Sequence, residues 1–177
     1  MMIPFPNKKY DIIYADPPWP GKYWRGETDF YPEMSMEDIY ALPVSDISAE
    51  NAYCFLWVID GILPACLLTL KHWGFEYRKS FIWDKMIISM GYYNRGQHEQ
   101  LLMGSKGKPM QMSVPVPSSI IRCKRGAHSV KPVQIRERIS KMFPTQSKIE
   151  LFARPNWTDY DRGWDFWGNE VSAEGEL

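Results

Sequence analysis

Short apolar runs alternate along the chain with segments whose apolar residues recur every three or four positions. The runs predict buried strands, because β-branched and aromatic residues gather in them between turn-forming residues. The longer segments predict amphipathic helices. Strands are expected at residues 10–15, 52–59, 78–83, 98–103 and 148–153, and helices at 35–42, 61–73 and 132–143.

The ends of these helices carry recognisable signals. Ser35, with Asp38 three residues later, is a typical N-terminal cap. Pro64 is tolerated in a first turn and Gly74 ends the second helix. Strands alternating with helices of about ten residues predict an α/β domain with a mostly parallel sheet. In such sheets ligands bind beyond the carboxyl ends of the strands, which places Asp16 and Arg154 at one crevice.

Three segments follow neither period. Residues 21–32 mix glycine, charge and aromatic rings and are expected to form a surface loop. Residues 104–119 are rich in glycine, serine and proline and predict a mobile loop. Residues 172–177 predict a frayed acidic tail. With no repeat and no second domain in the pattern, residues 1–177 are expected to form a single domain.

Composition narrows the functional classes. The formal net charge is zero, so the chain is not a basic nucleic-acid binder as a whole, and any such partner must bind a local patch. Aromatic residues make up 15% of the chain, enough for stacking surfaces as well as a core. The three cysteines have no metal-ligand spacing, which predicts no metal and a reducing compartment. Without a signal peptide or a membrane-length apolar run, we expect a cytoplasmic protein.

The sequence YADPPW at residues 14–19 carries the candidate chemistry. An exocyclic amine on a base is a poor nucleophile because its lone pair is delocalised into the ring. The Asp16 carboxylate can accept one of its N–H groups, and the carbonyl of Pro17 can accept the other. Pro18 fixes the direction of that carbonyl, and the ring of Trp19 offers a surface for stacking. On these residues alone, a structural turn after a strand is the simpler interpretation.

The remainder of the chain decides between the two interpretations, because it resembles the DPPW-type N6-adenine methyltransferase family, named for the seventy-kilodalton subunit of the mRNA adenosine methyltransferase. The resemblance runs in the family's order over nearly the whole chain. The blocks are YADPPW at 14–19, YPEMSMEDI at 31–39, FLWV at 55–58, GFEYRKSFIWDK at 74–85, GQHEQLLMGSKG at 96–107, HSVKP at 128–132, KIELFARP at 148–155 and WDFWGNEV at 164–171.

The resemblance implies a Rossmann-like fold that uses S-adenosylmethionine, with the catalytic motif ahead of the cofactor-binding strand. It places Asp16 beside the donor methyl group as well as the target adenine. It implies that Lys131 contacts the methionine end of the cofactor. The other cofactor positions that it implies are Phe152, Arg154, Asn169 and Glu170. Lys131 at a helix start is also compatible with a solvated charge that has no function.

The substrate is expected to be a flipped adenine in DNA, since the chain resembles the compact bacterial and phage members of the family. Tyr31 matches a substrate-loop position, and Tyr23 and Trp24 can receive the base. The basic cluster Arg122, Lys124 and Arg125 is a candidate for phosphate contacts. Two alternatives stay open, namely RNA as the substrate and an inactive nucleic-acid-binding partner subunit. The intact Asp16 argues against the second, and a homodimer is compatible with the sequence.

Three further interpretations concern residues outside these groups. Three tryptophans are expected to be structural packing residues at the rim, namely Trp157, Trp164 and Trp167. Glu150 either hydrogen-bonds to a neighbouring loop or lines the cofactor site. His98 and Glu99 form an acid–base pair or, as we prefer, shape the crevice at a strand start.

Overall fold

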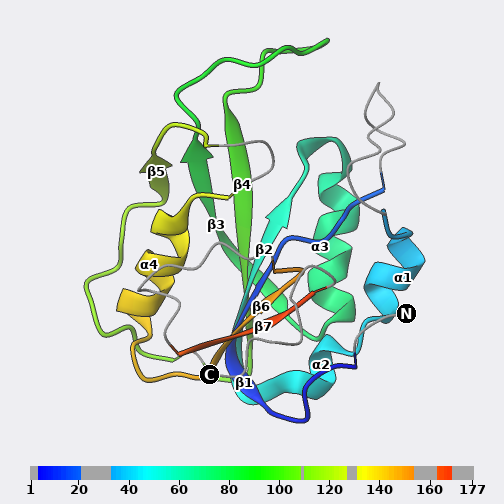
Figure 1. Cartoon of the computed structure of the whole chain (residues 1–177), viewed down its shortest axis with the longest axis vertical. Coiled ribbons are helices and arrows are strands. Elements are labelled where there is room, and N and C mark those ends of the chain that lie inside the picture. The colour runs from blue at the N-terminus through cyan, green and yellow to red at the C-terminus, as the bar shows by residue number, and fades with distance from the viewer. Residues whose placement is uncertain (1–3, 21–32, 109, 127–130, 154–162, 169–177) are drawn as a thin grey trace.

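A seven-stranded sheet, in the order β5-β3-β4-β2-β1-β6-β7, forms the centre of the molecule (Figure 1). The computed structural model describes residues 4–20, 33–108, 110–126, 131–153 and 163–168. The strands are β1 (Tyr10–Ala15), β2 (Ser48–Val58), β3 (Glu76–Asp84), β4 (His98–Lys106), β5 (Ile120–Arg122), β6 (Lys148–Leu151) and β7 (Trp164–Trp167). The helices are α1 (Met36–Ala41), α2 (Val44–Ile47), the 3-10 turn η2 (Asp60–Ile62), α3 (Leu63–His72) and α4 (Val133–Met142).

The sheet is mostly parallel, as predicted. β1 runs parallel to β2 and β6, β6 to β7, and β3 to β5. β4 is the exception and pairs antiparallel with both β2 and β3. A parallel neighbour needs a crossover connection, whereas β3 and β4 are joined directly by the loop at residues 85–97.

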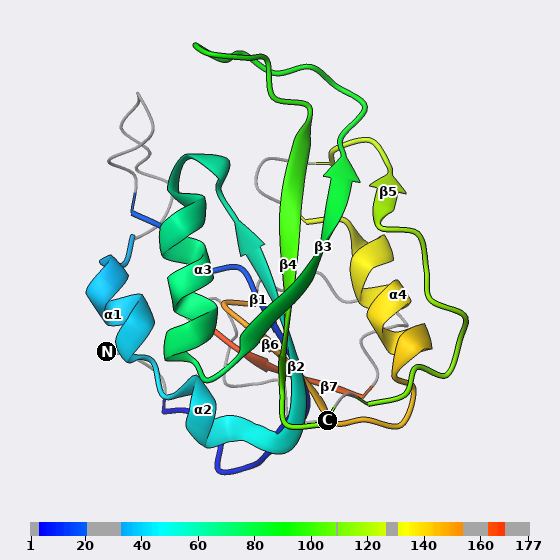
Figure 2. The same cartoon turned by 180° about the vertical axis from the view of Figure 1, so that it is seen from behind.

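The two faces of the sheet are covered by different helices, with α1, α2 and α3 on one side and α4 on the other (Figures 1 and 2). Successive residues of β2 alternate between the two cores. Cys54 and Leu56 pack on the side of α3, whereas Phe55 and Trp57 pack on the side of α4. Side chains of a strand point alternately to opposite faces, so a strand that is covered on both sides appears in the sequence as one apolar run.

The helix signals in the sequence are confirmed. The Ser35 hydroxyl accepts a hydrogen bond from the backbone N–H of Asp38 at 3.0 Å, which caps α1. Pro64 lies in the first turn of α3. Gly74 has a φ of +85°, the left-handed conformation that favours glycine after a helix.

The predicted loop at residues 104–119 is wrong at its start, because β4 continues to Lys106. Gly104 pairs with Cys54 on β2 and with Tyr77 on β3. Its missing side chain admits Phe75 and Leu70, since an added Cβ would lie 3.0 and 3.2 Å from their side chains. Glycine here is the sign of close packing. The mobility of the rest of that segment stays a prediction.

Three short elements were absent from the prediction: α2, β5 and β7. β5 has three residues and β7 has four, too few for a period to be visible in the sequence. Trp164 and Trp167 on β7 are buried, which confirms their structural interpretation. Trp157 and the predicted tail at residues 172–177 lie outside the described residues.

No helix in the described ranges has both the length and the apolar content needed to cross a membrane.

Candidate active site at the carboxyl edge of the sheet

Several polar side chains lie where the strands end. Asp16 follows β1, and Asp60 comes shortly after the end of β2. Because β4 is antiparallel, its first residues lie at the same edge, and Glu99 pairs in register with Trp83 near the end of β3. Carboxyl ends of parallel strands form the usual ligand-binding edge of an α/β sheet.

Lys131 joins two of these carboxylates. Its Nζ lies 3.1 Å from Oδ2 of Asp16 and 3.2 Å from Oε2 of Glu99. The side chain of Lys131 is 22% exposed, and each carboxylate is 30% exposed. Burial lowers the pKa of Lys131, but the charges of Asp16 and Glu99 and their hydrogen bonds outweigh it and raise the pKa above its usual value. Lys131 is therefore an ammonium at neutral pH, and the structure places it against Asp16; its contact with the cofactor stays a prediction.

An aromatic floor lies under this ion pair. The Lys131 ammonium lies 5.3 Å from the ring centroid of Trp57, within cation–π range. Trp57 is buried and its indole N–H donates to the Tyr14 hydroxyl at 2.7 Å. Burial raises the pKa of Tyr14, so the hydroxyl stays a neutral phenol. Sequence reasoning missed Trp57 as a site residue, and the FLWV run showed it only as a strand residue.

The prolines after Asp16 form a tight turn. The backbone N–H of Trp19 donates to the carbonyl of Pro17 at 2.8 Å, two residues earlier, which is the pattern of a γ-turn. The carbonyl of Pro18 accepts from the backbone N–H of Met34 at 3.0 Å. The Pro17 carbonyl has two lone pairs, of which the turn uses one, and no other residue with a described position donates to it.

Trp19 is an anchor of this turn. Its side chain is 5% exposed, and its indole N–H donates to the backbone carbonyl of Trp57 at 3.1 Å. The expectation that its ring offers a stacking surface is wrong for this conformation, since the ring packs in the core on the side of α3. Tyr14 and Trp19 thus fix both sides of Asp16 to β2 through Trp57.

Beyond β6 and β7 the backbone is tightly packed. Phe152 has a φ of +62°, a conformation that is rare for a residue other than glycine and that recurs at functional sites. The Ala153 N–H donates to the Trp167 carbonyl at 3.0 Å. An added Cβ on Gly168 would lie 2.9 and 3.0 Å from the backbone of Ala153. Phe152 lies at the predicted edge, and Arg154, Asn169 and Glu170 lie outside the described residues.

The remaining polar candidates have different partners; they are Glu150, His98 and Glu99. The guanidinium of Arg136 on α4 lies 2.8 Å from Oε2 of Glu150, so this carboxylate forms an ion pair with a helix residue. His98 lies 3.7 Å from Asp60, whereas Glu99 contacts Lys131, so the two neighbours have different partners and the acid–base pair is not formed.

The substrate candidates are only partly described. Tyr23, Trp24 and Tyr31 lie outside the described residues. Arg122, Lys124 and Arg125 are exposed, and Nε of Arg122 lies 3.5 Å from Oδ2 of Asp84. Their contact with phosphate stays a prediction.

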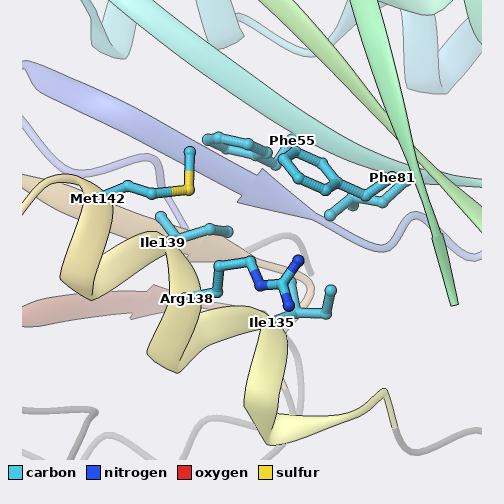
Figure 3. A pocket seen from close by; sticks show the side chains of 7 residues that line it. Phe55, Phe81, Ile135, Arg138, Ile139 and Met142 are labelled. Atoms are coloured by element: carbon cyan, nitrogen blue, oxygen red, sulfur yellow. The ribbon is translucent and has the colours of Figure 1, made fainter. Parts of the chain in front are cut away.

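A small apolar space lies apart from these residues, between α4 and the sheet (Figure 3). Phe55, Phe81, Ile135 and Ile139 line it, and the Arg138 guanidinium donates to the Ser118 carbonyl beside it. Its empty volume is about 180 Å³, and part of that volume is open to solvent. We interpret it as a packing gap. Among the residues with described positions, no group of three or more His, Cys, Asp or Glu side chains is placed to hold a metal ion.

Comparison with known proteins agrees with this geometry. The MT-A70 family model matches residues 10–170. The type II methyltransferase M.MunI of Mycoplasma sp is 35% identical, over 94% of this chain and 79% of its own length. The N(6)-adenosine-methyltransferase MT-A70-like protein of Drosophila melanogaster is 30% identical over 93% of this chain and 27% of its own length. The human N(6)-adenosine-methyltransferase catalytic subunit METTL3 is 27% identical over 93% of this chain and 29% of its own length. The chain therefore belongs to the MT-A70 family and is an adenine-N6 methyltransferase.

Proposed function

We propose that this enzyme transfers a methyl group from S-adenosylmethionine to the N6 amine of adenine in DNA, at the edge of the sheet that carries Asp16. One observation carries the proposal. The Asp16 carboxylate stands at the end of β1, held by Lys131 on one side and followed by the rigid turn of Pro17 and Pro18 on the other.

The role of Asp16 follows from the chemistry of the amine. An N6 nitrogen becomes nucleophilic when acceptors take its N–H groups and its lone pair turns out of conjugation. Asp16 accepts one N–H, and the free lone pair of the Pro17 carbonyl accepts the other. Because both acceptors are fixed before the substrate arrives, the amine is oriented with little further loss of entropy. The proton that the nitrogen must lose leaves by way of the Asp16 carboxylate to solvent.

Trp19 supports this arrangement from behind. Its buried ring and its bond to the Trp57 carbonyl hold the turn against β2. A displacement of the acceptors by about 1 Å can reduce the rate by about a hundredfold. Trp19 therefore acts on the rate by positioning the Pro17 carbonyl.

The residues present fit the methyl donor. When bound, S-adenosylmethionine supplies an activated methyl group on sulfur. The Lys131 ammonium has three N–H donors, and Asp16 and Glu99 take two of them. No ion pair within the described ranges uses the third, which we assign to the carboxylate of the donor's methionine end, while the same side chain keeps Asp16 in place. Phe152, with its rare backbone conformation, lines the donor site, and Arg154, Asn169 and Glu170 complete it by the family resemblance.

DNA is favoured as the substrate by the type II methyltransferase, of which the chain covers 79%, because the type II designation belongs to DNA modification. The adenosine methyltransferases are matched over less than a third of their length, so RNA remains the second candidate. Retention of Asp16 speaks against an inactive subunit.

The test is transfer of a radiolabelled methyl group to DNA and RNA oligonucleotide pools of the same sequences. We expect label in DNA and at most a trace in RNA. Label confined to RNA would contradict the substrate assignment. Donor binding without label in either polymer would contradict catalysis by this chain.

A further inference from the structure

The loop between β3 and β4, residues 85–97, extends beyond the end of the sheet (green in Figures 1 and 2). Its tip exposes large side chains. Met90 is 92% exposed, Tyr92 88% and Tyr93 97%. Met86, Ile87 and Ile88 nearer the sheet are each about half exposed. A contiguous group of exposed apolar and aromatic residues on a soluble domain marks a binding surface.

The base of this loop is well fixed. The backbone N–H of Ser89 donates to the Gly96 carbonyl at 2.9 Å, and that of Lys85 donates to the Gln97 carbonyl at 2.9 Å. The Asp84 carboxylate accepts from the backbone N–H of Met86 and from the side chain of Gln97, both at 2.9 Å. The loop thus continues the β3–β4 pair outward as a ribbon.

The tip itself has a defined shape. Gly91 approaches the backbone of Asn94 so closely that an added Cβ would lie 1.7 Å from its carbonyl oxygen. The rings of Tyr92 and Tyr93 meet edge to face, with centroids 5.1 Å apart. The exposed aromatic side chains are therefore presented on a tight turn.

The charges of the loop favour a polyanion as the partner. Between residues 85 and 97 the charged side chains are Lys85 and Arg95, and no acid occurs. Arg122 lies beside the base of the loop through its ion pair with Asp84. A basic, aromatic and apolar tip fits the phosphates and the stacked bases of a nucleic acid.

The base of the loop also adjoins the site. Nζ of Lys85 lies 3.5 Å from Oε1 of Glu99, and Glu99 contacts Lys131, which contacts Asp16. A duplex that touches the tip would thus lie at the edge of the sheet where the adenine must enter.

We propose that the tip of the β3–β4 loop, residues 90–93, is a wedge that enters duplex DNA and occupies the space that the flipped adenine leaves. Apolar side chains that insert between base steps unstack them, and such a wedge offsets the free energy that removal of a base from the stack costs. The inference rests on the proposed function, because a wedge matters only for a base that starts inside a duplex.

The test compares the wild type with the triple variant Met90→Ser, Tyr92→Ser, Tyr93→Ser. The substrate is a polymerase-amplified DNA of several kilobases, which carries no methylation, used as a duplex and after heat denaturation. The matched control is Val116→Ser, which removes another exposed apolar side chain, 82% exposed, from a different segment. Circular dichroism and sedimentation velocity without DNA accompany the methylation rates.

We expect the duplex-to-denatured rate ratio of the triple variant to fall at least about tenfold, with the denatured rate kept and the control unchanged. An unchanged ratio would overturn the wedge. A wild-type dimer that the triple variant converts to monomers, with equal loss on both substrates, would overturn it in favour of self-association. A wild type that methylates only denatured DNA would also overturn it. A wild type that methylates neither contradicts the proposed function itself, which is a separate failure.

Discussion

The Lys131 ammonium lies 3.1 Å from the Asp16 carboxylate and 3.2 Å from that of Glu99, with the ring of Trp57 beneath it. One cation thus holds the acceptor that ends β1 and a carboxylate at the start of β4. The contact links two parts of the sequence more than a hundred residues apart. The ion pair fixes the position of Asp16, and under the proposed function the same ammonium also binds the donor.

Replacement of Lys131 by methionine should weaken donor binding. A charge-assisted hydrogen bond contributes about 1.5–3 kcal/mol, so the Kd for S-adenosylmethionine should rise about ten- to a hundredfold in isothermal titration calorimetry. Lys131→Arg should retain more affinity, since it keeps the charge. Lys124→Met removes an exposed lysine and is the control. Equal affinity of Lys131→Met and wild type for S-adenosylmethionine would show that Lys131 does not bind the donor.

The raised pKa of Lys131 predicts a stability difference that depends on pH. A group whose pKa is higher in the folded state stabilises the fold below its unfolded pKa, which is 10.5 for this lysine. The stabilisation is lost as the pH rises through the folded value. The free energy of unfolding of wild type minus that of Lys131→Met, from urea titrations, should be constant from pH 7 to about 10 and decrease above 10.5. A difference that decreases below pH 9 would contradict this.

Gly168→Ala should destabilise the protein. The new methyl group would lie within 3.1 Å of the Ala153 and Phe152 backbone, which cannot move like a side-chain end. We expect a loss of about 1–3 kcal/mol in the free energy of unfolding. Gly61→Ala is the matched control, because an added Cβ there meets nothing within 4 Å. Equal stability of the two variants would show that β6 and β7 do not approach as closely as the structure has them.

The thiols should differ in reactivity. Cys54 and Cys66 are fully buried, whereas Cys123 is partly exposed. Burial raises the pKa of Cys54 far above its usual value and that of Cys66 to about 11, so neither forms a thiolate at pH 8. Ellman's reagent should titrate one thiol in the native protein and three in guanidinium chloride. Fast reaction of two or more native thiols would contradict the burial.

The long helices and strands could be predicted from sequence because each has enough residues to show its own hydrophobic period. β1 was predicted with its observed bounds. Ser35 caps α1 and Gly74 follows the end of α3, as the sequence signals predict. β5 and β7 could not be predicted, because a strand of three or four residues is too short to show a hydrophobic period. Each is stabilised by pairing with its neighbour in the sheet. Gly104 in β4 led to the wrong prediction of a loop. The reason for glycine there is the close packing of Phe75 and Leu70, which only the folded structure shows.

The site was predictable in part. The DPPW sequence indicated Asp16, and the family resemblance indicated Lys131 as a separate site residue. The structure places the two side chains in contact. The contribution of Glu99 depends on the antiparallel direction of β4, which the sequence does not reveal. The burial of Trp19 depends on tertiary packing against the helices, so the same ring that suggested stacking is an anchor.

The proposed function depends on one role of Asp16, which is to direct methyl transfer to the N6 amine of adenine in DNA. Its most direct test is mass spectrometry of nucleosides from unmethylated DNA after incubation with deuterated-methyl S-adenosylmethionine, using wild type and Asp16→Asn. We expect labelled N6-methyldeoxyadenosine with wild type and at least a hundredfold less with Asp16→Asn, which corresponds to about 3 kcal/mol of transition-state stabilisation. Both proteins should fold alike by circular dichroism. Label on another base, or equal N6 labelling by the two proteins, would contradict it.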